Sequence, residues 1–287
     1  MAAFSFSDLS ISEAVADQYG SVMGILGALY AETPFTFLSA VSAAILFRFR
    51  PRGKKWLNVL TGILFLACLL GLSFYGGYLL QDYPGDYGID IPKWVGYVLA
   101  VPYAGLALLI AYRLKPVDKA ALNRAAIVDL LYFLLVVIVL MLSLKALWGR
   151  PRYRFLISEA NDGYSFQPWY VISPANPDSS NWYSFPSGHT MNATGMLCLA
   201  LFYRNQHPVL DERYRLLRAG IFAFIAMVAV SRVRNAAHFA SDVTAGFFLG
   251  YLVLDLLETF LYPRLGSWLP PESGLPSPSV DTPSSLS

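Results

Sequence analysis

Residues 126–147, AIVDLLYFLLVVIVLMLSLKAL, form an apolar run in which the only charged residues are Asp129 and Lys145. A helix needs about 20 mostly apolar residues to cross the roughly 30 Å of hydrocarbon in a bilayer, because it rises about 1.5 Å per residue. This run meets that length and therefore predicts a transmembrane helix. Five other runs meet or approach the same test: 56–80, 94–112, 187–203, 217–233 and 241–262.

A seventh candidate span covers 22–47, where Glu32-Thr33-Pro34 interrupts the apolar pattern. The interruption fits either one kinked span or an interfacial helix followed by a short span, and we favour one span. The sequence thus predicts an all-α, polytopic membrane helix bundle with six or seven transmembrane helices.

The composition agrees with a membrane protein. The 287 residues are 56% hydrophobic and 14% charged, whereas soluble domains average about 25% charged and 45–50% apolar residues. A net charge of +2 argues against nucleic acid as a partner. Cys68 and Cys198 lie in apolar runs, so we expect neither a disulfide framework nor a metal site from them. Three acidic residues and no Lys or Arg among the first twenty residues argue against a cleavable signal peptide.

Basic residues cluster on alternate connections between the spans. Thirteen of the 21 Lys and Arg residues lie in 48–55, 113–124 and 204–218. By the positive-inside rule these connections are expected to be cytoplasmic. The acidic connection at 81–93 and the long stretch at 148–185 would then lie on the outer side.

Ionisable residues gather at the outer ends of four spans. Such residues are costly near the membrane unless they serve a purpose. They lie at the end of the fourth span, the start of the fifth, the end of the sixth and the start of the last: Lys145, Arg150, Arg152, His189, Arg232, His238 and Asp242.

These residue types suit a phosphate group. Helix-ending Gly and Pro residues follow Lys145, so we expect Arg152 to fold back toward it, and guanidinium groups match phosphoryl oxygens. Ser187 and Gly188 open a helix, where free N–H groups and the helix dipole favour an anion. His189 would then lie beside the anion as a proton donor.

His238 and Asp242 are four residues apart at the start of the last span and so share one helix face. Asp242 can accept a hydrogen bond from one imidazole nitrogen of His238. The other nitrogen is then an oriented nucleophile.

The pattern Lys145-x6-Arg152, Pro186-Ser187-Gly188-His189 and Ser231-Arg232-x5-His238-x3-Asp242 resembles the three-part signature of the type 2 phosphatidic acid phosphatase superfamily. Within it, the chain is most similar to the bacterial integral-membrane lipid phosphatases. The resemblance implies a four-helix phosphatase core at 126–262. The apolar runs predict N-terminal membrane helices at 1–125, and the Pro- and Ser-rich composition predicts a disordered tail at 263–287.

One position departs from the family pattern. The family has proline after the arginine of the first motif, whereas this chain has Tyr153, and Arg150-Pro151 supplies such a pair two residues earlier. We assign the phosphate contact to Arg152 on spacing and keep Arg150 as a second candidate ligand.

The resemblance implies a two-step reaction that uses neither a metal nor another cofactor. His238 attacks phosphorus to give a phosphohistidine, Asp242 orients its ring, and His189 protonates the leaving group and then activates water. The phosphoryl oxygens would be held by Lys145, Arg152, Ser187, Gly188 and Arg232.

The expected substrate is a membrane lipid that carries a phosphomonoester or a pyrophosphate. Undecaprenyl pyrophosphate, phosphatidylglycerol phosphate and phosphatidic acid all fit. We expect the site on the extracytoplasmic face of a bacterial plasma membrane, and no obligate protein partner is evident.

Other interpretations stay open. A phosphotransferase would pass the phosphoryl group to a sugar or lipid alcohol, and a related phosphatase could act on a soluble sugar phosphate. A channel or binder could use the same cations, although it would not need the oriented pair His238 and Asp242. These two residues and His189 could also form a metal site, but three nearby cations would repel a metal ion.

Two further features have weaker implications. The aromatic-rich segment 153–185 fits an interfacial belt or a lid over the phosphate site. Asp129, Asp255 and Glu258 lie in apolar runs without a motif, and His207 lies in a basic loop. We assign none of these four a function.

Overall fold

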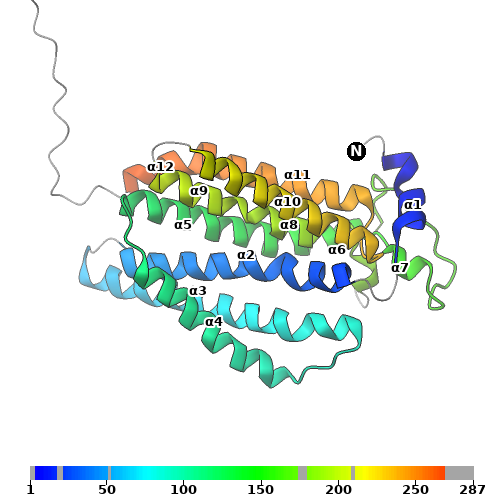
Figure 1. Cartoon of the computed structure of the whole chain (residues 1–287), viewed down its shortest axis with the longest axis horizontal. Coiled ribbons are helices and arrows are strands. Elements are labelled where there is room, and N and C mark those ends of the chain that lie inside the picture. Colours follow the sequence, from blue (N-terminus) through cyan, green and yellow to red (C-terminus); the bar gives the residue numbers. More distant parts are fainter. Residues whose placement is uncertain (1–3, 18–21, 51–52, 174–179, 208–210, 269–287) are drawn as a thin grey trace, which may run out of the picture.

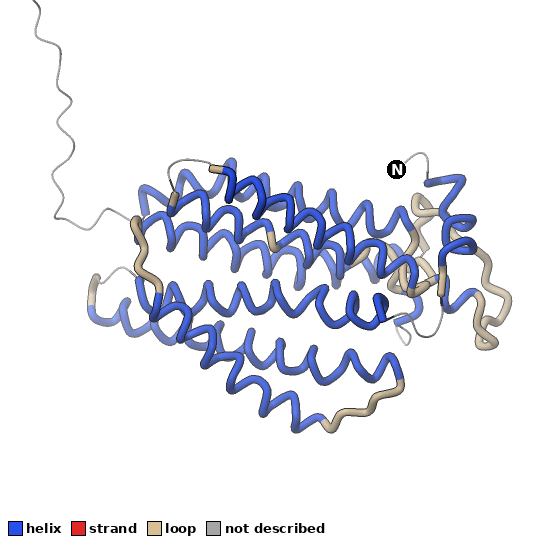
Figure 2. The backbone as a smooth tube through the Cα atoms, in the orientation of Figure 1, coloured by secondary structure: helices blue, strands red, loops and turns tan. Residues whose placement is uncertain are grey.

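The apolar runs of the sequence form a bundle of long helices in the computed structural model, which describes residues 4–17, 22–50, 53–173, 180–207 and 211–268 (Figure 1). Every regular element within these ranges is helical (Figure 2). The elements are α1 (Phe4–Val15), α2 (Val22–Phe49), α3 (Lys55–Asp82), η1 (Tyr83–Tyr87), α4 (Lys93–Arg113), α5 (Lys119–Phe133), η2 (Leu134–Leu140), α6 (Met141–Trp148), α7 (Tyr153–Leu156), η3 (Ser180–Trp182), α8 (Gly188–Gly195), α9 (Leu197–Gln206), α10 (Glu212–Arg234), α11 (Ala240–Leu256), η4 (Leu257–Leu261) and α12 (Tyr262–Trp268).

Six of the described helical segments are long and apolar enough to cross a membrane: 30–49, 55–85, 93–113, 119–137, 212–234 and 240–266. The protein is therefore an integral membrane protein with an all-α fold. The expected span at 187–203 is divided into α8 and α9, which meet at Met196. α2 continues through Pro34 without a break, which confirms one helix in place of an interfacial helix followed by a short span.

The predicted start of the tail was wrong. The helix of α11 continues through η4 and α12 to Trp268, beyond the expected boundary at 263. Pro263 lies inside this continuous helix, just after the π-helical turn η4. Leu265 is buried in the core, which anchors this turn. The rest of the expected tail, 269–287, lies outside the described residues.

α2 lies at the centre of the bundle and contacts α3, α5, α8 and α10. Small residues let it approach its neighbours closely. A Cβ atom on Gly27 would overlap the side chain of Ser231 in α10, and one on Gly195 of α8 would lie 2.5 Å from the ring of Phe35. These two approaches fix α2 against the helices that lead into the predicted site.

α3 and α4 form a hairpin on one side of the bundle (Figure 1). Their backbones approach at Gly77 and Gly96, as is common between helices in membranes. Large apolar side chains such as Trp56, Ile63 and Val101 are exposed on this hairpin. An exposed apolar surface of this kind is expected to face the hydrocarbon of the bilayer.

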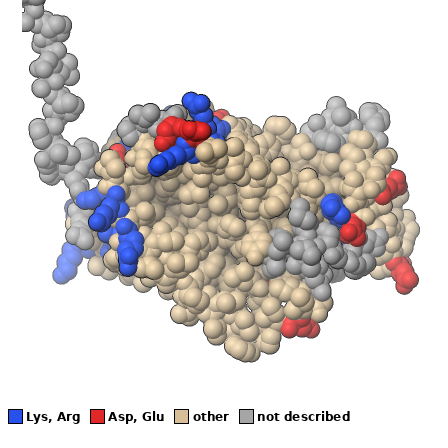
Figure 3. Space-filling model, viewed as in Figure 1, with Lys and Arg blue, Asp and Glu red and all other residues tan. Residues whose placement is uncertain are grey.

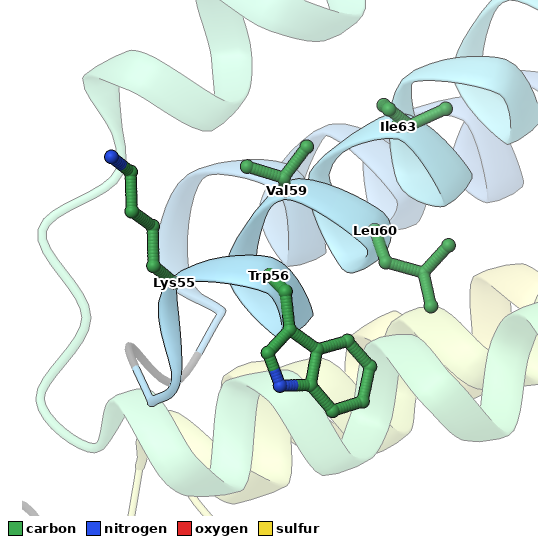
Figure 4. A pocket seen from close by; sticks show the side chains of 5 residues that line it. All are labelled: Lys55, Trp56, Val59, Leu60 and Ile63. Carbon is green, nitrogen blue, oxygen red and sulfur yellow. The ribbon is translucent and has the colours of Figure 1, made fainter.

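A shallow apolar hollow lies at the start of α3 (Figure 4), lined by Lys55, Trp56, Val59, Leu60 and Ile63. None of the predicted site residues lines it.

The two ends of the bundle differ in charge. The connections that carry the predicted site residues lie at the end where α1 and α7 pack, and Lys and Arg side chains gather at the opposite end (Figures 1 and 3). The expected clusters at 48–55, 113–124 and 204–218 belong to that opposite end. The helices therefore place the predicted site and the basic connections at opposite ends of the bundle.

Replacing Gly246 by alanine should destabilise the protein. A Cβ atom there would lie 2.5 Å from the carbonyl oxygen of Ser187, where α11 crosses the start of α8, and such overpacking costs about 1–3 kcal/mol. Thermal unfolding in detergent measures the effect. Gly71→Ala is the matched control, because a Cβ atom there meets nothing within 4 Å and alanine favours a helix. Equal melting temperatures for the two variants would contradict this packing.

Candidate active site

His238 lies in the short turn between α10 and α11, and its side chain is fully buried. The turn contains Ala236 with a φ of 52°, a left-handed conformation that is uncommon for residues other than glycine. The carbonyl of Ala236 accepts a hydrogen bond of 2.8 Å from the backbone N–H of Arg154. The chain after the first motif thus holds the turn that presents His238.

The orientation of the His238 ring follows from one hydrogen bond. Nδ1 lies 2.6 Å from the carbonyl oxygen of Ser184. Because a carbonyl oxygen can only accept, Nδ1 carries the proton and Nε2 carries the lone pair. Nε2 is buried and has no hydrogen-bond partner within the described residues. It is the ring nitrogen that can attack an electrophile.

Asp242 holds this ring less directly than the spacing predicted. Its Oδ2 lies 3.8 Å from Nδ1 of His238, which is too long for a hydrogen bond. Oδ2 instead accepts from the hydroxyl of Ser184 at 2.5 Å and from the backbone N–H of Phe239 at 2.8 Å. Since Ser184 also supplies the carbonyl for Nδ1, Asp242 orients the ring through Ser184.

Arg150 is fully buried and is bound by protein groups on several sides. One terminal nitrogen donates to Asp242 at 2.5 Å and to Ser241 at 2.8 Å, and the other donates to Asp8 at 2.9 Å. Nε donates to the carbonyl of Gln167 at 2.8 Å. Four of its five N–H donors are therefore engaged. This arrangement does not support Arg150 as a phosphate ligand and makes it a buried structural cation.

Three other cations lie near the two histidines. The charges of Arg152, Lys145 and Arg232 act on both His189 and His238. Arg152 lies two residues after Arg150 in the sequence, and its backbone N–H donates to the carbonyl of Asn181 at 2.8 Å. The structure thus gathers the expected phosphate ligands of the first and third motifs.

Ser187 ends the loop before α8, and its backbone N–H donates to the carbonyl of Asp242 at 3.0 Å. Its hydroxyl oxygen accepts from the N–H and the hydroxyl of Thr190, at 3.4 and 3.1 Å. The hydroxyl hydrogen of Ser187 remains available to an anion at the start of the helix. Gly188 is the first residue of α8, where N–H groups have no partner within the helix.

His189 follows on α8 and faces His238, with 6.2 Å between the ring centroids. It is 8% exposed, and neither ring nitrogen has a hydrogen-bond partner within the described residues. The two imidazoles therefore lie on either side of a small region that cations surround.

Three residues at this site were not predicted. Asp8 of α1 binds Arg150, Ser184 binds the ring of His238, and Glu32 of α2 lies 3.7 Å from Nδ1 of His189. Glu32 carried a usable signal, because an ionisable residue inside an apolar run is costly and calls for a partner. Asp8 and Ser184 carried no comparable signal in the sequence.

The aromatic-rich segment packs on itself at this end of the bundle. Phe155, Tyr164 and Trp182 form one cluster with ring centroids 4.5–6.0 Å apart. Trp169 and Phe185 belong to a second cluster. These contacts make part of the segment a folded cover and not a row of separate interfacial anchors.

No three His, Cys, Asp or Glu side chains are arranged to hold a metal ion within the part of the chain that the structure describes. The site residues there are the two histidines, the cations around them and the carboxylates of Asp8, Glu32 and Asp242.

Residues 126–264 match the PAP2 superfamily. The match covers all three motifs and the helices that carry them. This part of the chain is a PAP2 superfamily domain. The PAP2 domain contributes both histidines, and α1 and α2 lie outside it.

Several curated proteins are similar to part of this chain. Phosphatidylglycerophosphatase B of Bacillus subtilis is 37% identical over 81 residues, which are 27% of this chain and 39% of that protein. Phosphatidylglycerophosphatase B of Haemophilus influenzae is 31% identical over 101 residues, 34% of this chain and 42% of that protein. Lipid A 1-phosphatase of Porphyromonas gingivalis is 33% identical over 87 residues, 30% of this chain and 18% of that protein. The matches thus cover less than half of each relative, and no solved structure gives a significant match.

Arg150 and Arg152 should respond differently to substitution. Arg150→Gln leaves the buried carboxylates of Asp8 and Asp242 without their cation, and breaking a buried ion pair costs about 3–5 kcal/mol. Arg152→Gln removes a half-buried cation and should cost clearly less. Thermal unfolding in detergent compares the two variants. A smaller loss for Arg150→Gln than for Arg152→Gln would contradict the structural role of Arg150.

Proposed function

We propose that this protein is a membrane-embedded lipid phosphatase that hydrolyses a phosphomonoester or pyrophosphate through a phosphohistidine on His238. The observation that carries the proposal is the pair of buried, facing imidazoles within a PAP2 domain. Nε2 of His238 has a free lone pair, and Lys145, Arg152 and Arg232 supply positive charge around it. Fixed cations in a buried site stabilise the charge of a transferred phosphoryl group.

In the first step Nε2 of His238 forms a bond to phosphorus, and the bond between phosphorus and the leaving oxygen breaks. The electron pair goes to that oxygen, which takes a proton from His189. The proton on Nδ1 of His238 stays there and is donated in a hydrogen bond to the carbonyl oxygen of Ser184, so the ring can carry the positive charge of the phosphohistidine.

In the second step a water molecule attacks phosphorus from the side that the leaving group has vacated. His189 now takes a proton from the water, and the electrons of the P–N bond return to Nε2 of His238. The products are the dephosphorylated lipid and inorganic phosphate, and both histidines regain their starting states.

The substrate proposal follows from the relatives and the membrane setting. Two similar proteins are named for phosphatidylglycerophosphate and one for lipid A. We therefore place phosphatidylglycerol phosphate first, with undecaprenyl pyrophosphate and phosphatidic acid as further candidates. Lys and Arg side chains gather at the end of the bundle opposite α1 and α7 (Figures 1 and 3). By the positive-inside rule this arrangement favours an extracytoplasmic site in a bacterial plasma membrane.

Purified protein should release phosphate from at least one diacyl or polyprenyl phosphate in the presence of EDTA. His238→Ala should reduce release by at least about 10³-fold, because it removes the nucleophile. Orthovanadate, which resembles the five-coordinate transition state, should inhibit. Phosphate release on a panel of lipid phosphates in detergent micelles measures all three effects.

The same panel distinguishes the alternatives. Release abolished by EDTA alone would contradict the metal-free mechanism. Release that requires an added alcohol acceptor would indicate a phosphotransferase. Equal release from a soluble sugar phosphate without detergent would contradict the lipid as substrate.

The pH dependence should show a nucleophile that stays neutral under mildly acidic conditions. Burial of the ring, followed by the charges of Arg152 and Lys145, lowers the pKa of His238 well below its ordinary value of 6.5. The acidic limb of kcat/KM that belongs to His238 should therefore lie below pH 6.5. Arg152→Gln removes a cation, so its acidic limb should move to higher pH. Profiles of both enzymes on one substrate measure this shift, and an unmoved limb would contradict it.

A further inference from the structure

Glu32 brings a carboxylate into the site from outside the PAP2 domain. It lies on α2 and is 4% exposed. α2 is fixed on either side of it by the close approaches at Gly27 and Gly195. A buried carboxylate is costly unless a cation or hydrogen-bond donors compensate it. The backbone at Glu32 is thus held rigidly, and its carboxylate needs a cation or a hydrogen-bond donor beside it.

The partner is His189. Oε1 of Glu32 lies 3.7 Å from Nδ1 of His189, and the other oxygen accepts from the hydroxyl of Tyr75 at 3.5 Å. The side chain of Tyr83 also interacts with Glu32, and its ring lies beside the imidazole of His189, with ring centroids 5.5 Å apart. The 3.7 Å separation is longer than a hydrogen bond, and such contacts in unliganded enzymes often shorten when the substrate binds.

Charges from several elements surround His189. Glu32 faces it from α2 and Tyr83 from η1, while Tyr75 of α3 contacts Glu32. The other charged and titratable groups belong to the PAP2 domain. They are Arg232, His238, Lys145 and Arg152. Cations alone would disfavour a protonated imidazole, so the mechanism needs a negative charge at this point.

The formal charges around the two histidines show how much negative charge a protonated His189 requires. Among the residues that the structure describes, four cations, Lys145, Arg150, Arg152 and Arg232, stand against three carboxylates, Asp8, Glu32 and Asp242. With both histidines neutral, the site has an excess of one positive charge. A bound phosphomonoester dianion turns this into an excess of one negative charge, which a proton on His189 balances. Without the charge of Glu32 the bound site is already balanced, and the proton is no longer favoured.

We propose that Glu32 is a positioning residue that accepts a hydrogen bond from Nδ1–H of His189 and keeps this imidazole protonated in the substrate complex. Nε2–H of His189 then faces the leaving oxygen and donates its proton as the P–O bond breaks. In the second step Nε2 of His189 takes one proton back from water. The other proton stays on Nδ1 throughout, hydrogen-bonded to Glu32. This inference rests on the proposed phosphatase function.

Glu32→Gln tests the proposal on two substrates with the same hydrocarbon chain. One is an alkyl phosphate, whose leaving alkoxide needs a proton, and the other a nitrophenyl phosphate, whose leaving anion is stable without one. We expect kcat on the alkyl phosphate to fall by about 10²-fold or more, the usual scale of general acid catalysis. On the nitrophenyl phosphate kcat should fall by no more than about threefold. The basic limb of the kcat profile on the alkyl phosphate should also move to lower pH.

His189→Ala and Asp129→Asn are the matched comparisons. His189→Ala should lower kcat on both substrates, and more strongly on the alkyl phosphate, because it removes the acid of the first step and the base of the second. Asp129 is another fully buried carboxylate, on α5, and its interaction partners include Ser39, Ser42 and Cys198, which are not site residues. Asp129→Asn should leave kcat on both substrates unchanged. Glu32→Asp keeps the charge and should recover part of the activity on the alkyl phosphate.

The outcomes separate the role of Glu32 from the proposed function. Equal losses of kcat on both substrates for Glu32→Gln, or no loss on either, would overturn the role of Glu32 while the enzyme remains a phosphatase. Absence of phosphate release by the wild-type protein on both substrates would overturn the proposed function itself. Melting temperatures in detergent check that each variant is folded.

Discussion

A fully buried arginine between two carboxylates holds the site end of the bundle together. Arg150 bonds Asp8 of α1 on one side and Asp242 of α11 on the other. Removing these charges from water costs several kcal/mol per ion, and only good geometry with further hydrogen bonds offsets that cost. Ser241 supplies such bonds, because its backbone N–H donates to Asp8 at 2.9 Å and its hydroxyl accepts from Arg150 at 2.8 Å. Three segments far apart in the sequence are therefore locked in one geometry.

The ring of His238, the proposed nucleophile, is oriented by this network around Arg150. Arg150 fixes the carboxylate of Asp242, which holds the hydroxyl of Ser184, whose carbonyl in turn holds Nδ1 of His238. Each link is a short bond between buried groups, so the ring has little freedom to rotate. The lone pair on Nε2 then has a fixed direction before any substrate arrives, which is the preorganisation that phosphoryl transfer requires. The aromatic segment around Trp182 and Phe185 keeps water away from these bonds.

The sequence was sufficient for most of the long helices and for the motif residues that lie near one another, because both depend on local patterns: apolar run length and motif spacing. It was not sufficient for contacts that depend on three-dimensional distance. The i, i+4 spacing of His238 and Asp242 put them on one face but did not reveal that 3.8 Å separates them. Spacing favoured Arg152 over Arg150, and only the burial of Arg150 explains why the chain has a second arginine there. The extension of the last helix to Trp268 depends on the burial of Leu265, which composition does not reveal.

The N-terminal helices complete the electrostatics of the PAP2 domain. Within 126–264 the site has the cations Lys145, Arg150, Arg152 and Arg232 but one carboxylate, Asp242, among the charges around the histidines. A cluster with that imbalance inside a membrane protein would repel itself and would bind any anion without discrimination. α1 adds Asp8 and α2 adds Glu32, which leaves an excess of one positive charge for an incoming dianion. α1 and α2 are therefore part of the site, because the carboxylates of Asp8 and Glu32 that offset its positive charge lie outside the motif-bearing half of the chain.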